Sequence, residues 1–489
     1  MNLYKYLLLC CLGLLFACKK EIKPPVEPKP EPTEDDFIKG DIYDYFNKYS
    51  LWTEQIPDLD EEGRLEFVKK YSSNNNLLAA LKNMTPFYAG YNGSIDRFSF
   101  LDESSADGNL SYTDGFRMDT NEGYGLYYGW GILSSSATVA YPVIFFVEGG
   151  SPAQKEGVTR GSIVYAVNED EDITVGYNGS NLNQTDVRRV GAKLEAALEA
   201  SSLKLKVETA SGEEKVFTLG YEDAYEIDPV ILDSVYTYPD KNIGYLAYSS
   251  FEEVWPNTHQ NYIKLEEIFA SFKDANIKDL ILDLRYNTGG YVSTAEYLAN
   301  KMVNAADDGK LMFKYVVNDY LATSSQHKAS FQDVYLENRN SQLELENIYV
   351  LVTEQTASAA ELLISVLKPY LNVVLIAETD RTYGKPVGFF PEEITDDVTL
   401  WVTSFKTINA GGYTDYWNGM NVDEDNIDDY IFKDFGDATE NMIAKALDLA
   451  GVPKPSMRAS SRKSSVTQHG AKLGIINKPR ERNMLKMNN

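Results

Sequence analysis

The chain has 489 residues, enough for about three domains, and 43% of them are hydrophobic and 24% charged. This composition excludes a fibrous or wholly disordered protein. Asp and Glu number 73 and Lys and Arg 46, and the resulting formal charge of −27 argues against nucleic acid as a partner. The cysteines stand at positions 10, 11 and 18, so no disulfide, cysteine-ligated zinc site or cysteine nucleophile is expected farther along the chain.

The N-terminus has the pattern of an export signal. Lys5 precedes an apolar run over residues 7–16, which is too short to span a bilayer. The run ends in Leu15-Phe16-Ala17-Cys18 and resembles a bacterial lipobox, which implies cleavage before Cys18 and acylation of its sulfur. Residues 1–17 are therefore expected to be a lipoprotein signal peptide, with an ordinary signal peptide as the alternative. The lipid would hold the protein in the cell envelope, at the outer membrane on its periplasmic or surface face.

Two segments follow this signal. Residues 18–36 contain five prolines among charged residues, a composition that predicts an extended tether. In residues 37–93, apolar side chains recur on two helical faces, which predicts a small helical unit that packs rather than catalyses. These side chains are Ile38, Ile42, Phe46 and Tyr49, then Leu77, Leu78 and Leu81.

Residues 123–220 change to short apolar runs with turn signals, which predicts a β-rich domain. One segment of it resembles a PDZ domain of the kind found in bacterial proteases. The resemblance implies a short helix from Ser151-Pro152-Ala153, a turn at Gly161 and a strand over residues 163–167. It also implies that Gly125 and Leu126 receive the C-terminus of a peptide by strand addition.

Residues 221–450 alternate strand and helix patterns, which predicts an α/β domain with its site in the loops at the strand ends. Strands are expected over residues 243–248, 280–284, 348–352 and 373–377, and helices around residues 265–272, 295–302 and 360–367.

Three of these loops carry groups that could act together. Ser358 follows the strand at 348–352 and stands between small residues at a helix start, where a serine is either a helix cap or a nucleophile whose oxyanion meets free N–H groups. Lys385 follows the next strand, and alone it could equally be a solvated loop residue. Gly289 and Gly290 follow an earlier strand and let backbone N–H groups approach a ligand.

In order and spacing, these motifs resemble the C-terminal processing peptidases of family S41. The resemblance runs from about Ser94 to Leu449. It implies a crotonase-like (ClpP/crotonase-type) α/β catalytic domain that starts in residues 94–122 and carries the PDZ-like domain as an insertion. The lipobox and the small N-terminal helical unit resemble lipoprotein members from Bacteroidetes-type bacteria.

The same resemblance implies the chemistry. Ser358 would be the nucleophile and Lys385 the general base, and the N–H groups of Ala359 and of Gly289 or Gly290 would form the oxyanion hole. The substrates would be exported peptides or proteins, and neither a metal nor a cofactor is required.

The histidine content agrees with a Ser-Lys pair. The chain has only 3 histidines, of which His259 and His327 stand in polar, loop-like contexts and His469 lies near the C-terminus. A Ser-His-Asp triad would need an imidazole near Ser358. A lysine can replace it if burial lowers the lysine pKa toward the working pH.

One position departs from the family pattern. Many members have a glutamine four residues after the lysine that orients it, and this chain has Phe389 there. The orienting group is therefore missing or comes from elsewhere, and Tyr383 or Thr382 are candidates.

Three further segments have other interpretations. The acids of residues 423–429 alternate as in a calcium loop but lack the glycine and final glutamate of an EF-hand, so a solvated turn is expected. Gly129-Trp130-Gly131 lacks the third glycine of a dinucleotide fingerprint. Residues 451–489 are basic, with Glu481 as their one acid, which predicts a disordered tail that touches anionic lipid or wall polymer.

Two classes of function remain. One is a lipid-anchored serine endopeptidase, and the other is a catalytically inactive PDZ-containing lipoprotein that binds peptides. The presence of both Ser358 and Lys385 favours the first. A glycan-binding surface lipoprotein would share the anchor and the aromatic content, 12% of the residues, but would not explain these residues in family order.

Overall fold

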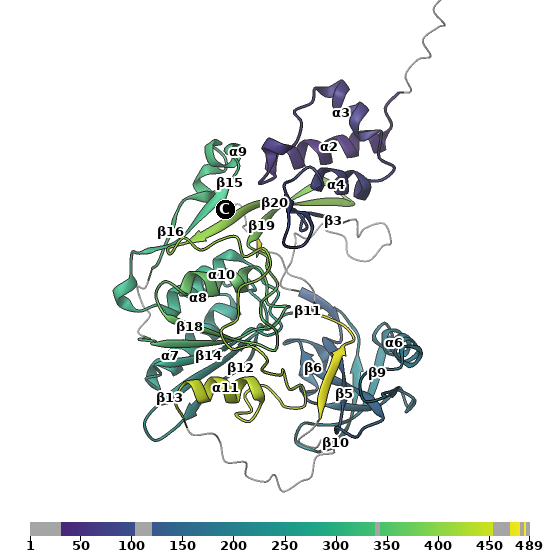
Figure 1. Ribbon diagram of the computed structural model, residues 1–489, viewed down its shortest axis with the longest axis vertical. Helices are drawn as coiled ribbons and strands as arrows, with labels where there is room; N and C mark the ends of the chain where they lie inside the picture. Colours follow the sequence, from purple (N-terminus) through teal and green to yellow (C-terminus); the bar gives the residue numbers. More distant parts are fainter. Residues whose placement is uncertain (1–30, 103–119, 338–342, 453–469, 480–483, 486–489) are drawn as a thin grey trace, which may run out of the picture.

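The computed structural model of the protein describes residues 31–102, 120–337, 343–452, 470–479 and 484–485. Cys18 and most of the proline-rich stretch lie outside these residues, so the lipidation site stays a prediction. None of the described helices is long and apolar enough to cross a membrane. Figure 1 shows a helical unit at the top, a core with two sheets, and a β-rich unit at the lower right.

Three helices form the N-terminal unit: α2 (Glu34–Tyr49), α3 (Glu61–Val68) and α4 (Asn74–Lys82). Thr33 caps α2, because its Oγ1 accepts the N–H of Asp36 at 3.2 Å and the Asp36 carboxylate accepts the N–H of Thr33 at 2.9 Å. Helix α2 therefore begins inside the stretch expected as tether. The predicted apolar faces are buried, and Phe46 and Leu81 belong to the same hydrophobic core as the central sheet. The unit folds with the core rather than apart from it.

The central sheet has the strand order β12-β13-β14-β17-β18. Its β12 is antiparallel to β13, and the other neighbours are parallel. The predicted strands agree with the observed ones to within one residue at each end. The strands are β12 (Val230–Thr237), β13 (Asn242–Tyr248), β14 (Asp279–Asp283), β17 (Asn347–Leu351) and β18 (Asn372–Ile376).

Helices connect the parallel strands and cover the sheet. The predicted apolar faces of α7 and α8 are buried, and every residue of α10 is buried, so α10 is a core helix. Helices α8 and α10 lie together above the sheet in Figure 1. The helices are α7 (Gln260–Asp274), α8 (Val292–Met302), α10 (Ala359–Leu367) and α11 (Asn441–Leu449).

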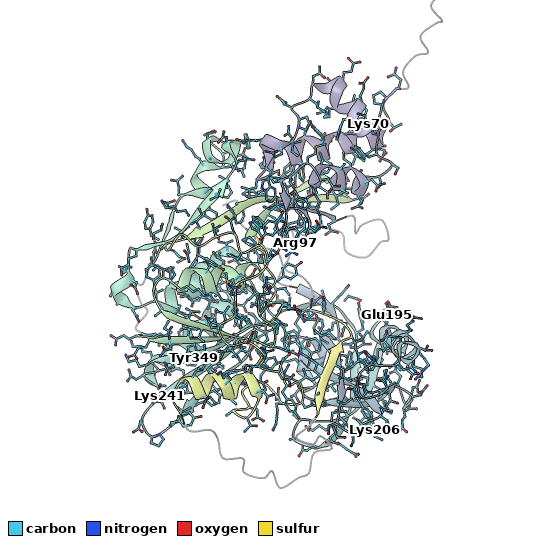
Figure 2. The ribbon with its side chains drawn as sticks, in the orientation of Figure 1. Lys70, Arg97, Glu195, Lys206, Lys241 and Tyr349 are labelled. Carbon is cyan, nitrogen blue, oxygen red and sulfur yellow. The ribbon has the colours of Figure 1, made fainter. Side chains whose placement is uncertain are left out.

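A second sheet has the order β16-β15-β20-β19-β22, with β3 paired to β20. Its long hairpin β19–β20 is not among the predicted elements, and α2 packs against it. Figure 2 shows Arg97 where the N-terminal unit meets this sheet. The strands are β3 (Phe100–Asp102), β15 (Leu311–Val317), β16 (Val334–Tyr335), β19 (Val387–Thr395), β20 (Val398–Asn409) and β22 (Met484–Leu485). Short elements complete the core: β1 (Phe87–Tyr88), β2 (Gly93–Ser94) and α9 (Asp319–Thr323).

The β-rich unit, residues 120–226, has its own apolar core and a sheet of order β10-β9-β7-β6-β5-β21. The predicted strand at 163–167 is β7, Ser151 caps the short helix α5, and Gly161 turns the chain with φ +84°. A ribbon of β4 and β11 joins the unit to the core. The elements are β4 (Thr120–Gly123), β5 (Leu126–Ile132), β6 (Val139–Val147), α5 (Pro152–Lys155), β7 (Ile163–Val167), β8 (Val175–Gly176), α6 (Gln184–Leu198), β9 (Ser202–Glu208), β10 (Glu214–Gly220) and β11 (Glu222–Glu226).

The expectation of a disordered C-terminal tail is wrong for part of it. Residues Ala471–Ile475 form β21, which pairs antiparallel with the edge strand β5. Composition could not reveal this strand, because its partner is a sheet edge that is distant in sequence and presents unpaired backbone groups. Residues 453–469 lie outside the described part of the chain.

Candidate active site

Ser358 immediately precedes α10, and its side chain is completely buried. Its backbone has φ +62° and ψ −119°, which L residues rarely adopt. An ordinary helix cap has an extended backbone instead. Strain of this kind costs about 1–3 kcal/mol and persists where the surroundings impose it, commonly at functional sites. The backbone of Ser358 is therefore strained in a way that an ordinary helix cap does not require.

Glu361, in the first turn of α10, joins Ser358 to the loop of Lys385. Its Oε2 accepts the N–H of Ser358 at 3.1 Å and the N–H of Lys385 at 2.8 Å. Its Oε1 accepts the hydroxyl of Thr382 at 2.5 Å and the N–H of Gly384 at 2.9 Å. Burial raises the pKa of this carboxyl, and the donated hydrogen bonds oppose the rise. One buried carboxyl group therefore ties the predicted serine to the predicted lysine.

Lys385 is buried among aromatic rings. Its Nζ lies 5.0 Å from the centroid of the Phe389 ring and 5.8 Å from that of Phe98. An ammonium at such distances is attracted by the ring faces. Phe389, at the position where many members of the resembled family have an orienting glutamine, is thus a direct aromatic neighbour of the lysine. Of the substitutes considered for it, Thr382 contacts Glu361 instead.

Arg97 fastens the lysine loop from outside. Its Nη2 donates to the carbonyl oxygens of Tyr383 and Gly384 at 3.2 Å each, and to that of Trp417 at 3.3 Å. Gly384 has φ +90°, and a Cβ on it would lie 2.3 Å from the backbone N of Gly419. Only glycine fits there. The loop is therefore held by Arg97 on one side and packs closely against the backbone at Gly419 on the other.

The glycine pair predicted for the oxyanion hole packs against Ser358. A Cβ on Gly289, which has φ +111°, would lie 2.7 Å from the Cβ of Ser358 and 3.1 Å from the N of Ala359. Gly289 therefore lies beside both the serine and the other predicted donor. Its own N–H donates to Oδ1 of Asn287 at 2.9 Å, so this predicted donor already has an acceptor.

Hydrogen bonds also join the three strand-end loops directly. The N–H of Ala357 donates to the carbonyl of Asn287 at 3.1 Å, and the N–H of Tyr383 donates to the carbonyl of Thr356 at 3.1 Å. The Thr356 hydroxyl donates to the carbonyl of Leu284 at 2.8 Å. The structure thus brings together the loops of Ser358, Lys385 and Gly289-Gly290.

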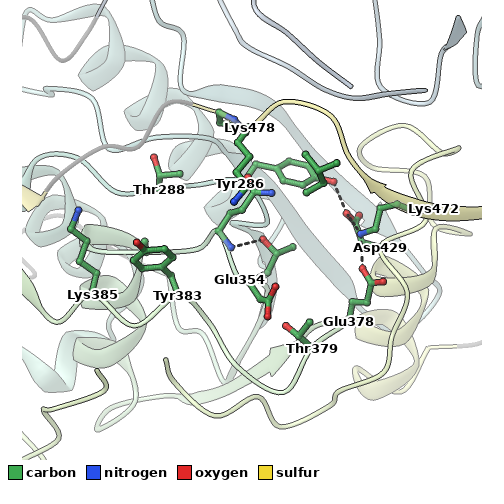
Figure 3. Close-up of a pocket in the computed structure, with 15 residues that line it drawn as sticks. Tyr286, Thr288, Glu354, Glu378, Thr379, Tyr383, Lys385, Asp429, Lys472 and Lys478 are labelled. Carbon is green, nitrogen blue, oxygen red and sulfur yellow. Dashed lines mark hydrogen bonds and ion pairs between the residues drawn. The ribbon is translucent and has the colours of Figure 1, made fainter. Parts of the chain in front are cut away.

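A pocket of about 180 Å³ opens beside these loops (Figure 3). Figure 3 shows Lys385, Tyr383 and Thr288 at one end and Asp429, Glu378 and Lys472 at the other. The C-terminal segment forms part of the wall through Lys472, Ile475, Lys478 and Pro479.

A buried ion cluster lies at the far end of this pocket. Oδ1 of Asp429 lies 2.7 Å from Nη2 of Arg160 and 2.9 Å from Nη1 of Arg285. Arg285 also pairs with Asp283 at 2.6 Å and with Glu440 at 3.3 Å. Because Arg160 belongs to the β-rich unit and Arg285 follows β14, the cluster joins that unit to the core.

Lys472 adds a third cation to this cluster. Its Nζ lies 3.3 Å from Oδ2 of Asp429 and 2.5 Å from Glu378. Burial alone would raise the pKa of Asp429, but Lys472, Arg160 and Arg285 hold it well below its usual range. The expected solvated acidic turn at residues 423–429 is therefore wrong at Asp429, which is 1% exposed.

The two described histidines lie elsewhere. His259 caps α7, with Nδ1 accepting the N–H of Asn261 at 3.3 Å. His327 is buried among aromatic rings, 5.7 Å from that of Tyr49 and 6.1 Å from that of Phe390. Neither lines the pocket. Within the described residues, no three His, Cys, Asp or Glu side chains are placed to hold a metal ion.

Sequence reasoning left Glu361, Arg97 and Asp429 without a role. Glu361 had a signal, since a glutamate three residues after a serine at a helix start is the capping-box spacing. The predicted peptide-binding residues Gly125 and Leu126 lie at the start of β5, where the Leu126 carbonyl accepts Nδ2 of Asn477 at 2.9 Å.

Comparison with known proteins relates part of this chain to one family of peptidases. The model of peptidase family S41 matches residues 242–425, which include all three strand-end loops. "Carboxy-terminal processing protease CtpA" of Bacillus subtilis (strain 168) is 26% identical over 265 residues, 54% of this chain and 48% of the relative. "Probable CtpA-like serine protease" of Staphylococcus epidermidis is 24% identical over 273 residues, 56% of this chain and 48% of the relative. The chain thus matches about half the length of these relatives.

A solved structure supports the fold over a longer stretch. The crystal structure named "Putative S41 protease from Bacteroides fragilis NCTC 9343" aligns with a TM-score of 0.59 at 24% identity, and the alignment covers 87% of this chain and all of the other. At this identity the likeness concerns the fold. Residues 242–425 thus match the model of peptidase family S41, and the longer alignment shows a shared fold.

Proposed function

We propose that this protein is a serine endopeptidase of the C-terminal processing type. The observation that carries the proposal is Ser358, a buried serine with φ +62° at the start of α10, tied by Glu361 to the loop of Lys385. A helix start offers free N–H groups to an anion, and strained backbone of this kind clusters at functional sites.

In the proposed reaction, Ser358 Oγ attacks the carbonyl carbon of the scissile peptide bond while neutral Lys385 Nζ accepts its proton. The C–N bond then breaks, and the leaving amine takes the proton from the Lys385 ammonium. Water attacks the resulting ester, Lys385 again accepts the proton, and the product leaves with a new carboxyl end while Ser358 recovers its hydroxyl hydrogen.

The negative oxygen formed during each attack would be held by two backbone N–H groups. Ala359 is the first donor, since it begins α10 directly after the serine. For the second we favour Gly290 over Gly289, because the N–H of Gly289 already donates to Asn287.

The remaining units would deliver the substrate. We propose that the core is crotonase-like and that the β-rich unit is PDZ-like, with the start of β5 at Gly125 and Leu126 receiving peptides by strand addition. The lipobox supports a lipid anchor on Cys18 in the cell envelope. Mass spectrometry of the mature protein tests the anchor, and a Cys18→Ala protein that still partitions with membranes through its N-terminus would contradict it.

One contact favours a second candidate function. The ring of Phe389 lies 5.0 Å from Lys385 Nζ, and an aromatic face attracts the ammonium form, which cannot act as a base. A protein that holds Lys385 in this form would bind peptides without cutting them.

The test measures hydrolysis of unfolded polypeptides by the purified protein, three variants of the proposed dyad and two control variants. Ser358→Ala and Lys385→Ala should each lower kcat/KM by about 1000-fold or more, as coupled catalytic residues do. Lys385→Arg should fail equally, because a guanidinium stays protonated. His259→Ala and His327→Ala are the controls and should keep their activity. Near-normal activity of Lys385→Ala would exclude the lysine as base, and a folded but inactive wild-type protein would favour peptide binding.

A further inference from the structure

The C-terminal segment follows the path that a peptide substrate would take. Strand β21 extends the sheet of the β-rich unit at β5, antiparallel, with Ala471 opposite Ile132 and Ile475 opposite Gly129. Its C-terminal direction therefore points toward the start of β5, where strand addition would bring the end of a peptide. Figure 1 shows β21 alongside β5.

The pairing continues beyond the strand through a side chain that copies a backbone amide. The N–H of Ile476 donates to the carbonyl of Tyr128 at 2.7 Å. Oδ1 of Asn477 then accepts the N–H of Tyr128 at 2.7 Å, and its Nδ2 donates to the carbonyl of Leu126 at 2.9 Å. Asn477 thus uses the edge groups of β5 that an added peptide strand would use.

The surface of β5 is shaped for this close approach. A Cβ on Gly129 would lie 2.9 Å from the carbonyl oxygen of Gly474, so the glycine leaves room for the segment. Leu473 and Ile476 pack against the apolar core of the β-rich unit. Backbone pairing and two apolar anchors are the elements of strand-addition recognition.

The segment then crosses the catalytic pocket. Lys478 and Pro479 line the same pocket as Ala357 and Lys385. Farther along, the backbone of β22 pairs with β19 at Gly388 and Phe389, close after the lysine. A substrate that reached Lys385 from the edge of β5 would need the space that this segment fills.

The segment is more exposed to solvent than the sheet it joins. Every residue of β5 is buried, whereas residues 471–478 are partly or fully exposed, and Ile475 is 38% exposed. The ladder also contains an irregularity between Lys472 and Gly474. Segments with few buried contacts open locally at a lower free energy than the whole fold.

We propose that residues 470–479 are a built-in peptide ligand that occupies the β5 edge and must leave before a protein substrate can reach Lys385. The proposal rests on the proposed function for its consequence, namely that the tethered ligand restrains peptidase activity. A tethered ligand competes at a high effective concentration, so weak contacts suffice.

Lys472 sets a preference among peptides that replace the segment. Among the ion pairs described above, the buried cluster has three carboxyl groups, those of Asp283, Asp429 and Glu440. Without Lys472 it has only two cations, Arg160 and Arg285. A competing peptide that carries Lys or Arg at this position replaces the lost partner of Asp429, and one that lacks it leaves Asp429 with weaker compensation.

The binding experiment uses inactive Ser358→Ala protein, so its result does not depend on catalysis. A fluorescent peptide of residues 470–479 is titrated against the full chain and against a chain that ends at residue 469. We expect at least ten-fold tighter binding to the shortened chain, at least ten-fold weaker binding of a Lys472→Ala peptide, and no binding of a scrambled peptide. Equal binding to both chains, or none to a folded shortened chain, would overturn the proposal.

A second variant covers the risk that the shortened chain does not fold. The full-length Leu473→Asp, Ile476→Asp protein keeps the length of the tail but loses its two apolar anchors, and it should bind the peptide as the shortened chain does. If neither variant gave a cooperative melting transition, the segment would be part of the structural core and the proposal would be wrong.

Measurements of peptide hydrolysis distinguish a failure of this inference from a failure of the proposed function. With Ser358 intact, removal of residues 470–489 should raise the rate of peptide hydrolysis at least five-fold. Equal hydrolysis by both chains would refute the restraint and leave the peptidase assignment standing. Selective peptide binding by the shortened chain, without hydrolysis by either, would refute the peptidase and leave the built-in ligand standing.

Discussion

Two buried carboxylates, Glu361 and Asp429, are stabilised in opposite ways. Glu361 accepts hydrogen bonds from three backbone N–H groups and a hydroxyl, and burial raises its pKa. Asp429 contacts two guanidinium groups and an ammonium, and its pKa lies well below the usual range. Neutral hydrogen-bond donors hold a buried carboxyl group in position, but its ionised form stays unfavourable. Neighbouring cations instead stabilise the ionised form. The first arrangement suits a junction between the loops of Ser358 and Lys385, and the second, through Arg160 and Arg285, suits a joint between the β-rich unit and the core.

The largest effect on stability should come from Asp429→Asn. The substitution keeps the shape of the side chain but leaves Arg160, Arg285 and Lys472 without a shared anion. Loss of one partner of a buried ion pair costs about 3–5 kcal/mol in the free energy of unfolding. Urea denaturation measures it, with Asp425→Asn in the exposed part of the same turn as the control. A cost no greater than that of the control would show that the cluster does not act as a joint.

Glu361→Gln should lower activity more than stability. Each oxygen of Glu361 accepts at least one backbone N–H, so either orientation of the glutamine amide directs its NH₂ group at a donor. The loops of Ser358 and Lys385 would then shift relative to each other. A displacement of about 1 Å costs about 100-fold in rate, so kcat should fall about 10- to 100-fold with a smaller change in KM.

The matched control for this variant is Glu344→Gln, because the Glu344 side chain is 75% exposed and pairs with Lys278 at the surface. Equal kinetics of the two variants, measured on one peptide substrate, would remove Glu361 from the positioning role.

Asp428, which lies beside the cluster, should make the free energy of unfolding depend on pH. Burial first, and then the charges of Glu378 and Asp429, raise its pKa to about 6, against 3.8 for the unconstrained group. Because the folded pKa is the higher one, protonated Asp428 favours the fold, and this contribution is lost as the pH rises from about 4 through about 6. Asp428→Asn should therefore match the wild type near pH 4 and be more stable at pH 8, by about 1–2 kcal/mol once partial exposure is allowed for.

Denaturation series at pH 4, 5, 6 and 8 measure this difference, again with Asp425→Asn as the control. A stability difference that stays constant across the series would show that Asp428 does not titrate with a raised pKa in the folded protein.

The smallest effect concerns the strain at Ser358. Glycine adopts φ +62° without the penalty that a Cβ imposes, so Ser358→Gly should be more stable than Ser358→Ala by about 1 kcal/mol, while both are inactive. Differential scanning calorimetry compares the two. A more stable alanine variant would mean that the junction does not impose the strained backbone.

Much of the core could be predicted from the sequence. Buried parallel strands are continuous apolar runs, so the order of the residues predicts the strand that contains Leu280-Ile281-Leu282 and the strands beside it. Ser358, Lys385 and the glycine pair could be located because parallel strands end at one edge of a sheet.

The contacts between distant segments could not be predicted in this way. Glu361 stands in a known motif, yet three of its four hydrogen-bond partners come from a loop more than twenty residues away. Asp429 and Lys472 are distant in sequence and come into contact only in the folded chain. The acidic residues around Asp429 and the basic residues around Lys472 each predict a solvated surface segment. The short strand β21 depends on β5 for its pairing, and no property of its own residues reveals that partner.

The backbone edge of β5, which β21 covers, also affects the tendency of the protein to self-associate. Strand β5 is seven residues long, apolar on average and buried along its whole length, and β21 is what lies between its backbone edge and the solvent. An uncovered edge of this kind is a template for pairing with another chain, and a formal charge of −27 only partly opposes such contacts. Departure of the segment therefore exposes a surface on which two copies can join edge to edge, so the time that the edge stays open governs self-association as well as access for peptides.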